Sequence, residues 1–177
     1  MDIACFGDSN TYGFDPRSYF GSRYPEERRW VNLLAAKTGW IVRNWGENGR
    51  EIPCTSIEIP SYIDSLLVML GTNDLLQGVG ASIAAKRMEH FLRQLPLKRE
   101  SIILIGPPPI KLGAWVPDQI LVDSSRQLLS EYQNLAEHMG IHYVPTHDWN
   151  IPLCFDGVHF TEEGHRIFSE KLYFVLS

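Results

Sequence analysis

The residue types in this sequence that are best suited to nucleophilic chemistry lie in two short polar clusters at opposite ends of the chain. Ser9 belongs to GDSN (residues 7–10), which directly follows the apolar run IACF (residues 3–6). A serine hydroxyl is a weak nucleophile near neutral pH and needs an adjacent base, most often a histidine oriented by a carboxylate. His159 meets this requirement, because Asp156 can reach its Nδ1 while its Nε2 remains free to face Ser9.

Two further clusters, GENGR (residues 46–50) and GTND (residues 71–74), could stabilise the negative charge that develops when a nucleophile attacks a carbonyl group. Gly49 can offer a backbone N–H with no side chain in the way, and Asn73 can offer a side-chain amide. The backbone N–H of Ser9 is a third donor. Each cluster taken alone is also typical of a turn, so the chemical interpretation requires a fold that brings the clusters together.

The predicted elements place these clusters at one edge of a sheet. Short apolar runs alternate with helical patterns, which favours an α/β fold with a parallel sheet and helices on both faces. The predicted strands cover residues 2–6, 41–45, 65–70, 101–105 and 141–144, and the predicted helices cover residues 25–39, 84–95, 121–139 and 161–176. We expect a five-stranded sheet with the order 2-1-3-4-5. In such sheets the loops at the carboxyl ends of the strands form the functional site. The polar clusters follow predicted strands, so we expect them at that edge of the sheet.

Four segments, in this order and at these intervals, resemble the SGNH (GDSL-type) hydrolases: FGDSNTYG, GENGR, MLGTND and DGVHFTEEGH. The resemblance covers almost the whole chain and is strongest to small single-domain bacterial esterases, arylesterases and acyltransferases. It implies one domain over residues 1–177, with a flavodoxin-like three-layer α/β/α sandwich.

The resemblance also implies a role for each motif residue. Ser9 resembles the nucleophile, His159 the general base and Asp156 the partner that orients the base. Gly49 and Asn73 resemble the oxyanion donors, beside the Ser9 amide. Within GENGR, Gly49 is preferred to Gly46 because of its distance from the asparagine at the end of the strand.

Three residues near these clusters are predicted to contact substrate: Asn10, Arg50 and Trp115. Asn10 departs from the family pattern, in which leucine most often follows the nucleophile, and its amide is expected either to alter the pocket wall or to cap the next turn. Two long connections at the edge of the site could line an acyl or alcohol pocket, or pack on a neighbouring subunit. Their candidate side chains are Phe14, Tyr19, Phe20, Trp115 and Val116.

Composition and charge exclude several classes of function. The chain has 177 residues and a formal net charge of −5, with scattered Lys and Arg, so no basic face for nucleic acid is expected. No apolar run reaches the roughly 18 residues that span a bilayer, and no leader precedes the first predicted strand. The three cysteines suit a reducing compartment. We therefore expect a cytoplasmic protein that binds neither nucleic acid nor membranes.

These observations predict a serine esterase that cleaves small carboxylic esters through an acyl-serine intermediate. A small-molecule ester is the expected partner, and a homo-oligomer is left open. We expect no cofactor and no metal, because Cys154, Asp156 and His159 have suitable ligand types but no clear fourth member. The alternative is a catalytically silent carbohydrate- or lipid-binding module. The sequence does not distinguish acetylated sugars, short-chain esters, thioesters and lysophospholipids as substrates. It also does not distinguish hydrolysis from acyl transfer.

Overall fold

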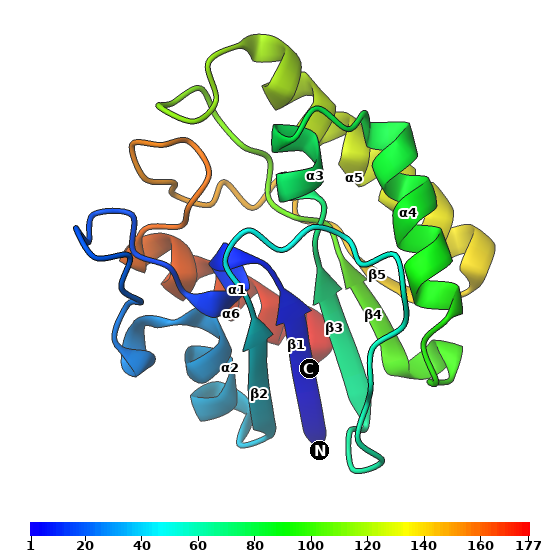
Figure 1. Cartoon of the computed structure of the whole chain (residues 1–177). Coiled ribbons are helices and arrows are strands. Elements are labelled where there is room, and N and C mark those ends of the chain that lie inside the picture. Colours follow the sequence, from blue (N-terminus) through cyan, green and yellow to red (C-terminus); the bar gives the residue numbers. More distant parts are fainter.

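Five parallel strands form the centre of the protein (Figure 1). The computed structural model describes residues 1–177. The strands are β1 (Asp2–Gly7), β2 (Ile41–Gly46), β3 (Ser65–Met69), β4 (Ile102–Ile105) and β5 (His142–Val144). Their order is β2-β1-β3-β4-β5, which confirms the predicted order and the α/β fold class. Because every pairing is parallel, the carboxyl ends of all five strands lie at one edge of the sheet.

Each face of the sheet carries its own hydrophobic core, because successive residues of a strand point to opposite faces. Ala4 and Phe6 belong to a cluster of 23 buried residues, whereas Ile3 and Cys5 belong to a cluster of 13. The continuous apolar run of β1 is therefore explained by a strand that is covered on both sides.

Four longer helices cover the two faces. α4 (Ala81–Arg93) and α5 (Gln119–Met139) pack on the larger cluster, and α2 (Trp30–Thr38) and α6 (Glu162–Leu176) pack on the smaller one. Two 3-10 turns, η1 (Glu26–Arg28) and η2 (Arg99–Ser101), precede α2 and β4. Thr161 caps α6, because its side chain accepts a hydrogen bond from the N–H three residues later, at 2.9 Å.

Two single-turn helices lie where the sequence suggested only turns. They are α1 (Ser9–Tyr12), which follows β1, and α3 (Thr72–Leu76), which follows β3. Segments of four or five residues are too short to show helical periodicity, so the apolar pattern could not reveal them. Both helices fix a polar cluster at the carboxyl edge of the sheet.

The connection between β2 and β3 contains no helix. Residues 47–64 instead run as a coil across the front of the sheet in Figure 1. Parallel strands are usually joined through a helix that covers one face. Here Ile52 and Ile63 of the coil enter the larger core, so the coil provides part of that cover.

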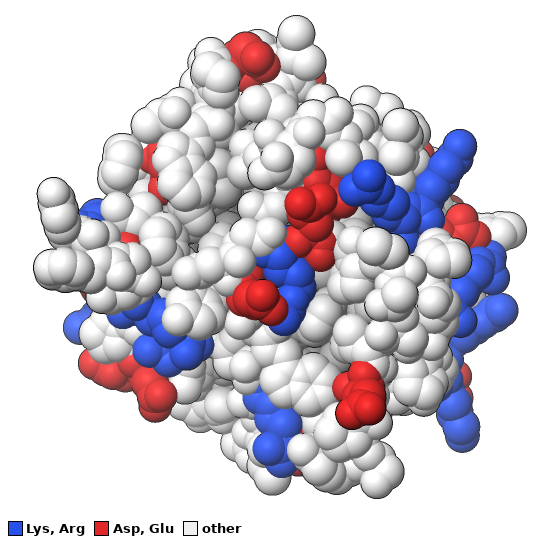
Figure 2. All heavy atoms as spheres, viewed as in Figure 1, with Lys and Arg blue, Asp and Glu red and all other residues white.

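Acidic and basic side chains are interspersed on the face shown in Figure 2, and wide uncharged areas separate them. This distribution agrees with the scattered charges in the sequence. None of the helices combines the length and the apolar character that a membrane span requires.

Candidate active site

A tight turn presents Ser9 at the carboxyl end of β1. The Asp8 side chain caps α1 by accepting a hydrogen bond from the Asn10 N–H at 3.0 Å. A Cβ at Gly7 would lie against the Thr11 side chain and against a backbone carbonyl of β3, so only glycine fits there. The close approach of α1 to β1 therefore depends on Gly7, and Asp8 has the structural role of a helix cap.

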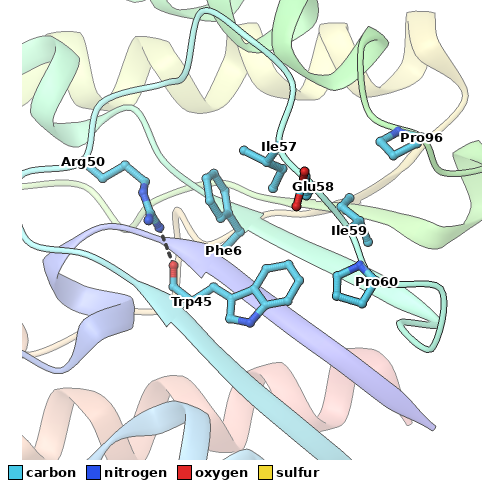
Figure 3. A pocket seen from close by; sticks show the side chains of 8 residues that line it. All are labelled: Phe6, Trp45, Arg50, Ile57, Glu58, Ile59, Pro60 and Pro96. Atoms are coloured by element: carbon cyan, nitrogen blue, oxygen red, sulfur yellow. Dashed lines mark hydrogen bonds between the residues drawn. The ribbon is translucent and has the colours of Figure 1, made fainter.

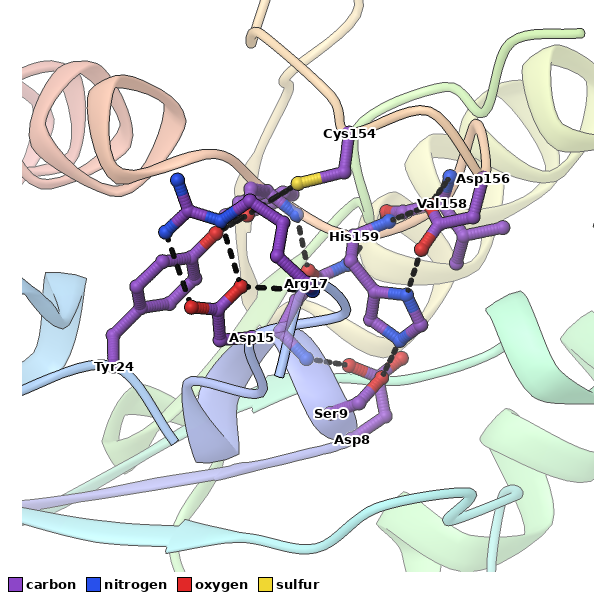
Figure 4. Close-up of polar contacts among 11 residues, drawn as sticks. Asp8, Ser9, Asp15, Arg17, Tyr24, Cys154, Asp156, Val158 and His159 are labelled. Carbon is purple, nitrogen blue, oxygen red and sulfur yellow. Dashed lines mark hydrogen bonds and ion pairs between the residues drawn. The ribbon is translucent and has the colours of Figure 1, made fainter. Parts of the chain in front are cut away.

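Ser9, His159 and Asp156 form one hydrogen-bonded chain (Figure 4). The Ser9 Oγ lies 3.0 Å from His159 Nε2, and His159 Nδ1 lies 2.7 Å from Asp156 Oδ2. The other carboxylate oxygen of Asp156 accepts the N–H groups of Val158 at 2.8 Å and His159 at 2.9 Å. When the imidazole is neutral with its proton on Nδ1, Nε2 can accept the Ser9 proton.

The two buried carboxylates of this region have opposite pKa shifts. Burial raises the pKa of Asp156, but the hydrogen bonds from His159 and from two backbone N–H groups outweigh burial, so its pKa lies below the ordinary value. Burial raises the pKa of Asp8 to about 6, against the opposing bond from the Asn10 N–H and the charges of His159 and Arg50. Asp156 is thus ionised over a wider pH range than Asp8.

The clusters that contain Gly49 and Asn73 are brought together by a hydrogen bond. Asn73 Nδ2 donates to the Arg50 carbonyl oxygen at 3.0 Å. Gly49 has a φ of +73° and lies beside open space, whereas the N–H of Gly46 donates to the Asn44 side chain at 2.9 Å. An N–H that already has this partner is less available to a ligand, which favours Gly49 over Gly46 as the candidate donor.

Asp74, which was not predicted as a site residue, makes a second link to the segment that contains Gly49. Its fully buried carboxylate accepts the Ile52 N–H at 3.0 Å and the Arg87 guanidinium at 3.0 Å. Burial raises the pKa of Asp74, and these two hydrogen bonds oppose the rise. α3 and α4 are thereby tied to the coil that carries Gly49. The only signal in the sequence was a second polar residue next to Asn73.

Asn10 was predicted to contact substrate, but the structure gives its side chain internal partners. The side chain is buried, and its Nδ2 donates to the Val158 carbonyl oxygen at 3.1 Å. Its Oδ1 accepts the Phe160 N–H at 2.9 Å. Both polar atoms therefore bind the backbone on either side of His159 and are not directed at a ligand.

Arg50, the second predicted contact residue, is also bonded within the protein. Its guanidinium donates to the carbonyl oxygens of Gly7, at 3.0 Å, and Trp45, and it pairs with the Glu47 carboxylate at 2.6 Å. The same group lies over the Phe6 ring, 4.2 Å from the centroid. Arg50 thus joins the ends of β1 and β2 to the coil that follows β2.

Trp115, the third predicted contact residue, lies beside the candidate base. Its ring centroid is 5.0 Å from that of His159, with an interplanar angle of 81°. Phe14 contacts the imidazole as well, at 4.8 Å between centroids. Trp115 is 53% exposed, so its ring can contact a ligand while it packs on His159.

The other side chains of the two long connections have different environments. Val116 is buried in a small apolar cluster beneath the β4–α5 connection, so it does not line a pocket. Tyr19 and Phe20 are 97% and 91% exposed and pack edge-to-face on each other at 5.8 Å. Of the five side chains considered as pocket walls, only Phe14 and Trp115 contact the candidate triad.

The thiol of Cys154 has partners other than Asp156 and His159. Its Sγ lies 3.7 Å from the Tyr24 hydroxyl and 3.5 Å from the Phe160 carbonyl oxygen (Figure 4). No group of three or more His, Cys, Asp or Glu side chains in the protein is arranged to hold a metal ion.

His165 is a second buried histidine that the sequence did not single out. Its Nδ1 accepts the Trp30 N–H at 3.4 Å, and its Nε2 has no partner. Burial lowers the pKa of His165 to about 3, so the ring is neutral at physiological pH. The ring packs edge-on against Tyr24 and Phe160, which indicates a role in packing.

Two pockets flank the coil that follows Gly49. One, of about 740 Å³, has mainly apolar walls that include Phe6, Trp45 and Ile57, with Arg50 at one end (Figure 3). The other, of about 750 Å³, lies between the coil and α4 and includes Lys86. Neither pocket is lined by a residue of the candidate triad.

The conserved features of a known family match nearly the whole chain. The model of the GDSL-like Lipase/Acylhydrolase family matches residues 5–167. The chain belongs to the GDSL-like lipase/acylhydrolase family. This membership confirms the resemblance seen in the motifs, and it identifies the protein as a carboxylic-ester hydrolase. A search of curated proteins found no match.

Solved structures share the fold of this GDSL-family chain over nearly its whole length. A carbohydrate acetylesterase family member from Sinorhizobium meliloti is 23% identical with a TM-score of 0.82, covering 99% of this chain and 97% of that one. The M. smegmatis aryl esterase is 22% identical with a TM-score of 0.81 and the same coverage. A lipolytic G-D-S-L family protein from Veillonella parvula is 23% identical with a TM-score of 0.73, again with the same coverage. At these identities the likeness concerns the fold.

Proposed function

We propose that this GDSL-family protein hydrolyses small carboxylic esters through an acyl-serine intermediate, with Ser9 as nucleophile and His159 as general base. The observation that carries the proposal is the continuous chain of hydrogen bonds from Ser9 Oγ through His159 to Asp156, at 3.0 and 2.7 Å. A hydroxyl in contact with a base that is oriented by an ionised carboxylate is the arrangement that activates serine.

In the first half of the reaction, Ser9 Oγ forms a bond to the ester carbonyl carbon while its proton passes to His159 Nε2. The carbonyl oxygen becomes an oxyanion, and the proposed donors to it are the N–H groups of Ser9 and Gly49 and the Asn73 amide. The bond to the alcohol oxygen then breaks, and His159 returns its proton to that oxygen. The alcohol leaves and the acyl group remains on Ser9.

In the second half, water takes the place of the alcohol. The water oxygen bonds to the acyl carbon while His159 accepts a proton from the water. The bond between the acyl carbon and Ser9 Oγ then breaks. His159 then returns the proton to Ser9, and the carboxylic acid leaves. Asp156 remains ionised throughout and stabilises the imidazolium.

The alcohol part of the substrate is proposed to lie against Trp115. The leaving oxygen must approach His159 Nε2 to take its proton, and the half-exposed Trp115 ring packs on that imidazole at 5.0 Å. A flat aromatic surface suits a sugar ring or an aryl ring. The printed names of the structural neighbours, a carbohydrate acetylesterase family member and an aryl esterase, support testing both classes.

Covalent labelling tests this proposal directly. A serine-directed fluorophosphonate should label the protein once, at Ser9, and Ser9→Ala should abolish both labelling and ester turnover. Ser125→Ala is the matched control, because Ser125 is buried, but its hydroxyl donates to the Val122 carbonyl oxygen, accepts the Ile110 N–H and has no histidine partner. p-Nitrophenyl esters of increasing chain length, tested beside acetylated sugars, would define the acyl group. Absence of labelling and of hydrolysis of every ester would instead support a silent binding module.

A further inference from the structure

The side chain of Asn10 connects the backbone next to the candidate nucleophile with the backbone around the candidate base. Its Nδ2 donates to the carbonyl of Val158 at 3.1 Å and its Oδ1 accepts the N–H of Phe160 at 2.9 Å. These two groups belong to the residues immediately before and after His159. Asn10 itself immediately follows Ser9, and it is only 7% exposed.

We propose that Asn10 is a positioning residue that holds His159 Nε2 at reacting distance from Ser9 Oγ, an inference that rests on the proposed function. Three hydrogen bonds join residues 8–13 to residues 155–161. One is the bond between Ser9 and His159, and the side chain of Asn10 makes the other two. The amide therefore sets the spacing of the two segments before a substrate arrives.

Asn10 can restrain the base only because Asn10 is itself held in place. Its N–H donates to Asp8 Oδ1 at 3.0 Å, and its carbonyl oxygen accepts the indole N–H of Trp30 at 3.0 Å. Trp30 is 1% exposed and belongs to the core beneath α2 and α6. Hydrogen bonds therefore connect Trp30 in the core to Asn10, and Asn10 to the loop that carries His159.

The other restraints on this loop have different origins. The Asp156 carboxylate binds N–H groups of its own loop, and the Trp115 N–H donates to the Asp156 carbonyl oxygen at 3.0 Å. The Tyr24 hydroxyl donates to the Phe160 carbonyl oxygen at 3.2 Å. These contacts shape the loop but do not fix its distance from Ser9, because none of them comes from the nucleophile turn.

An amide is the side chain that this position requires, because it offers one donor and one acceptor. Aspartate could still accept the Phe160 N–H, but it would place a carboxylate oxygen against the Val158 carbonyl with no proton between them. Leucine would leave both buried backbone groups without a partner. Both changes allow the loop to move relative to Ser9, and a misplacement of about 1 Å can cost on the order of a hundredfold in rate.

The test compares Asn10→Asp and Asn10→Leu with Tyr24→Phe. The control removes a hydrogen bond to the backbone of the same residue, Phe160, but one that does not come from the nucleophile turn. The concentration of active sites is titrated with fluorophosphonate, and the turnover rate is divided by it. All rates are measured well below the melting temperature of each variant. We expect kcat to fall about tenfold to a hundredfold in the Asn10 variants with KM changed little, and kcat to stay near wild type in Tyr24→Phe.

Two results would overturn the inference. One is a wild-type kcat per titrated site in both Asn10 variants, and the other is an equal loss in Tyr24→Phe, which would indicate general loop stability. A crystal structure of Asn10→Asp adds a readout that does not need turnover. We expect Ser9 Oγ and His159 Nε2 to lie beyond hydrogen-bond distance, and an unchanged distance would refute the positioning role even if the wild type hydrolysed no ester.

Discussion

Asp8 and Asp156 show how neighbouring partners decide the ionisation of a buried carboxyl group. Asp156 receives a bond from His159 and two backbone N–H bonds, and its pKa is lowered. Asp8 is also buried but receives fewer opposing hydrogen bonds, and its pKa is raised to about 6. Near neutral pH Asp8 therefore carries a charge that the folded state stabilises less well than water does.

Asp8→Asn should remove a pH-dependent cost to stability. Between about pH 4 and 6 the folded state of the wild type binds more protons at Asp8 than the unfolded state does, so the free energy of unfolding falls as the pH rises through this range. The variant keeps an acceptor for the Asn10 N–H but cannot ionise. Its gain relative to wild type should be near zero at pH 4 and up to about 3 kcal/mol at pH 7. Urea denaturation at several pH values measures this difference, and a constant difference would contradict the prediction.

Asn73 should act on the transition state more than on substrate binding. Asn73→Ala keeps the Ser9–His159 pair but removes one proposed oxyanion donor, so kcat should fall by about 10² to 10³ while KM changes far less. Asn73→Asp is the matched variant, because it keeps the shape but offers an acceptor in place of the donor, and it should be at least as slow. Steady-state kinetics on the best ester decide the matter. A raised KM with normal kcat would make Asn73 a residue that binds the ground state.

The candidate site could be predicted from sequence only where residue type and motif were enough. Ser9, Asp156 and His159 were identified because an alcohol, an acid and an imidazole occurred in recognisable segments. The internal roles of Asn10 and Arg50 were not visible, because the side chains of both residues bind backbone atoms of other segments. Asn10 binds carbonyl and N–H groups 148 and 150 residues away, and no pattern of residue types marks such groups. Asp74 was missed because its partners, the Ile52 N–H and the Arg87 guanidinium, lie 22 and 13 residues away in other elements.

At the scale of elements, a half-buried ion pair connects α3 and α4, and its carboxylate also binds the coil after β2. Asp74 on α3 is fully buried, and its partner Arg87 on α4 has 45% of its side chain exposed. The carboxylate also holds the Ile52 N–H, so one side chain joins three segments. A pair with one buried partner is costly to break, because the remaining carboxylate stays away from water.

Arg87→Gln should lower the free energy of unfolding by about 1 to 3 kcal/mol, since half of the pair is open to solvent. Arg93→Gln is the control on the same helix. Its guanidinium is similarly exposed and pairs with Glu89, but that pair lies on the surface and contacts no buried group. The control should change stability by less than about 0.5 kcal/mol in urea denaturation. Equal losses of stability in the two variants would show that Arg87 does not stabilise the buried Asp74 carboxylate.

The elements themselves were largely predictable because they are long enough to show a period. The strands and the longer helices lie within three residues of their predicted ranges, except that α2 begins five residues later than predicted, after the 3-10 turn η1. Gly39 and Gly140 end α2 and α5 in left-handed conformations. α1 and α3 were not predicted, because a single turn is stabilised by its surroundings and not by its own periodicity. The Asp8 cap and the packing of α1 over Gly7 are contacts of this kind.

At the scale of the whole molecule, the two hydrophobic cores share the same strands. Leu66 and Val68 face the larger core, and Leu67 and Met69, between and after them on β3, face the smaller one. Neither face can lose its helices without exposing one side of the sheet. We therefore expect the protein to unfold in a single cooperative transition.

Coincident denaturation curves test this expectation. Trp30 lies in the smaller core and Trp45 packs on the larger one, so tryptophan fluorescence reports on both faces. Fluorescence, far-UV circular dichroism and fluorophosphonate labelling should give the same urea midpoint. A separate, earlier loss of fluorescence with retained helical signal would indicate that one face unfolds on its own.

The separation of Ser9 and His159 along the chain has a consequence for biosynthesis. The two residues are 150 positions apart, and β1, an interior strand of the sheet, is synthesised before the other four strands. A nascent chain that ends just after β5 already contains every strand, yet it lacks Asp156, His159 and the backbone groups that Asn10 binds. Under the proposed mechanism such a chain can assemble its sheet but cannot take a proton from Ser9. The first ester cleaved would therefore report that synthesis has passed the loop that carries Asp156 and His159.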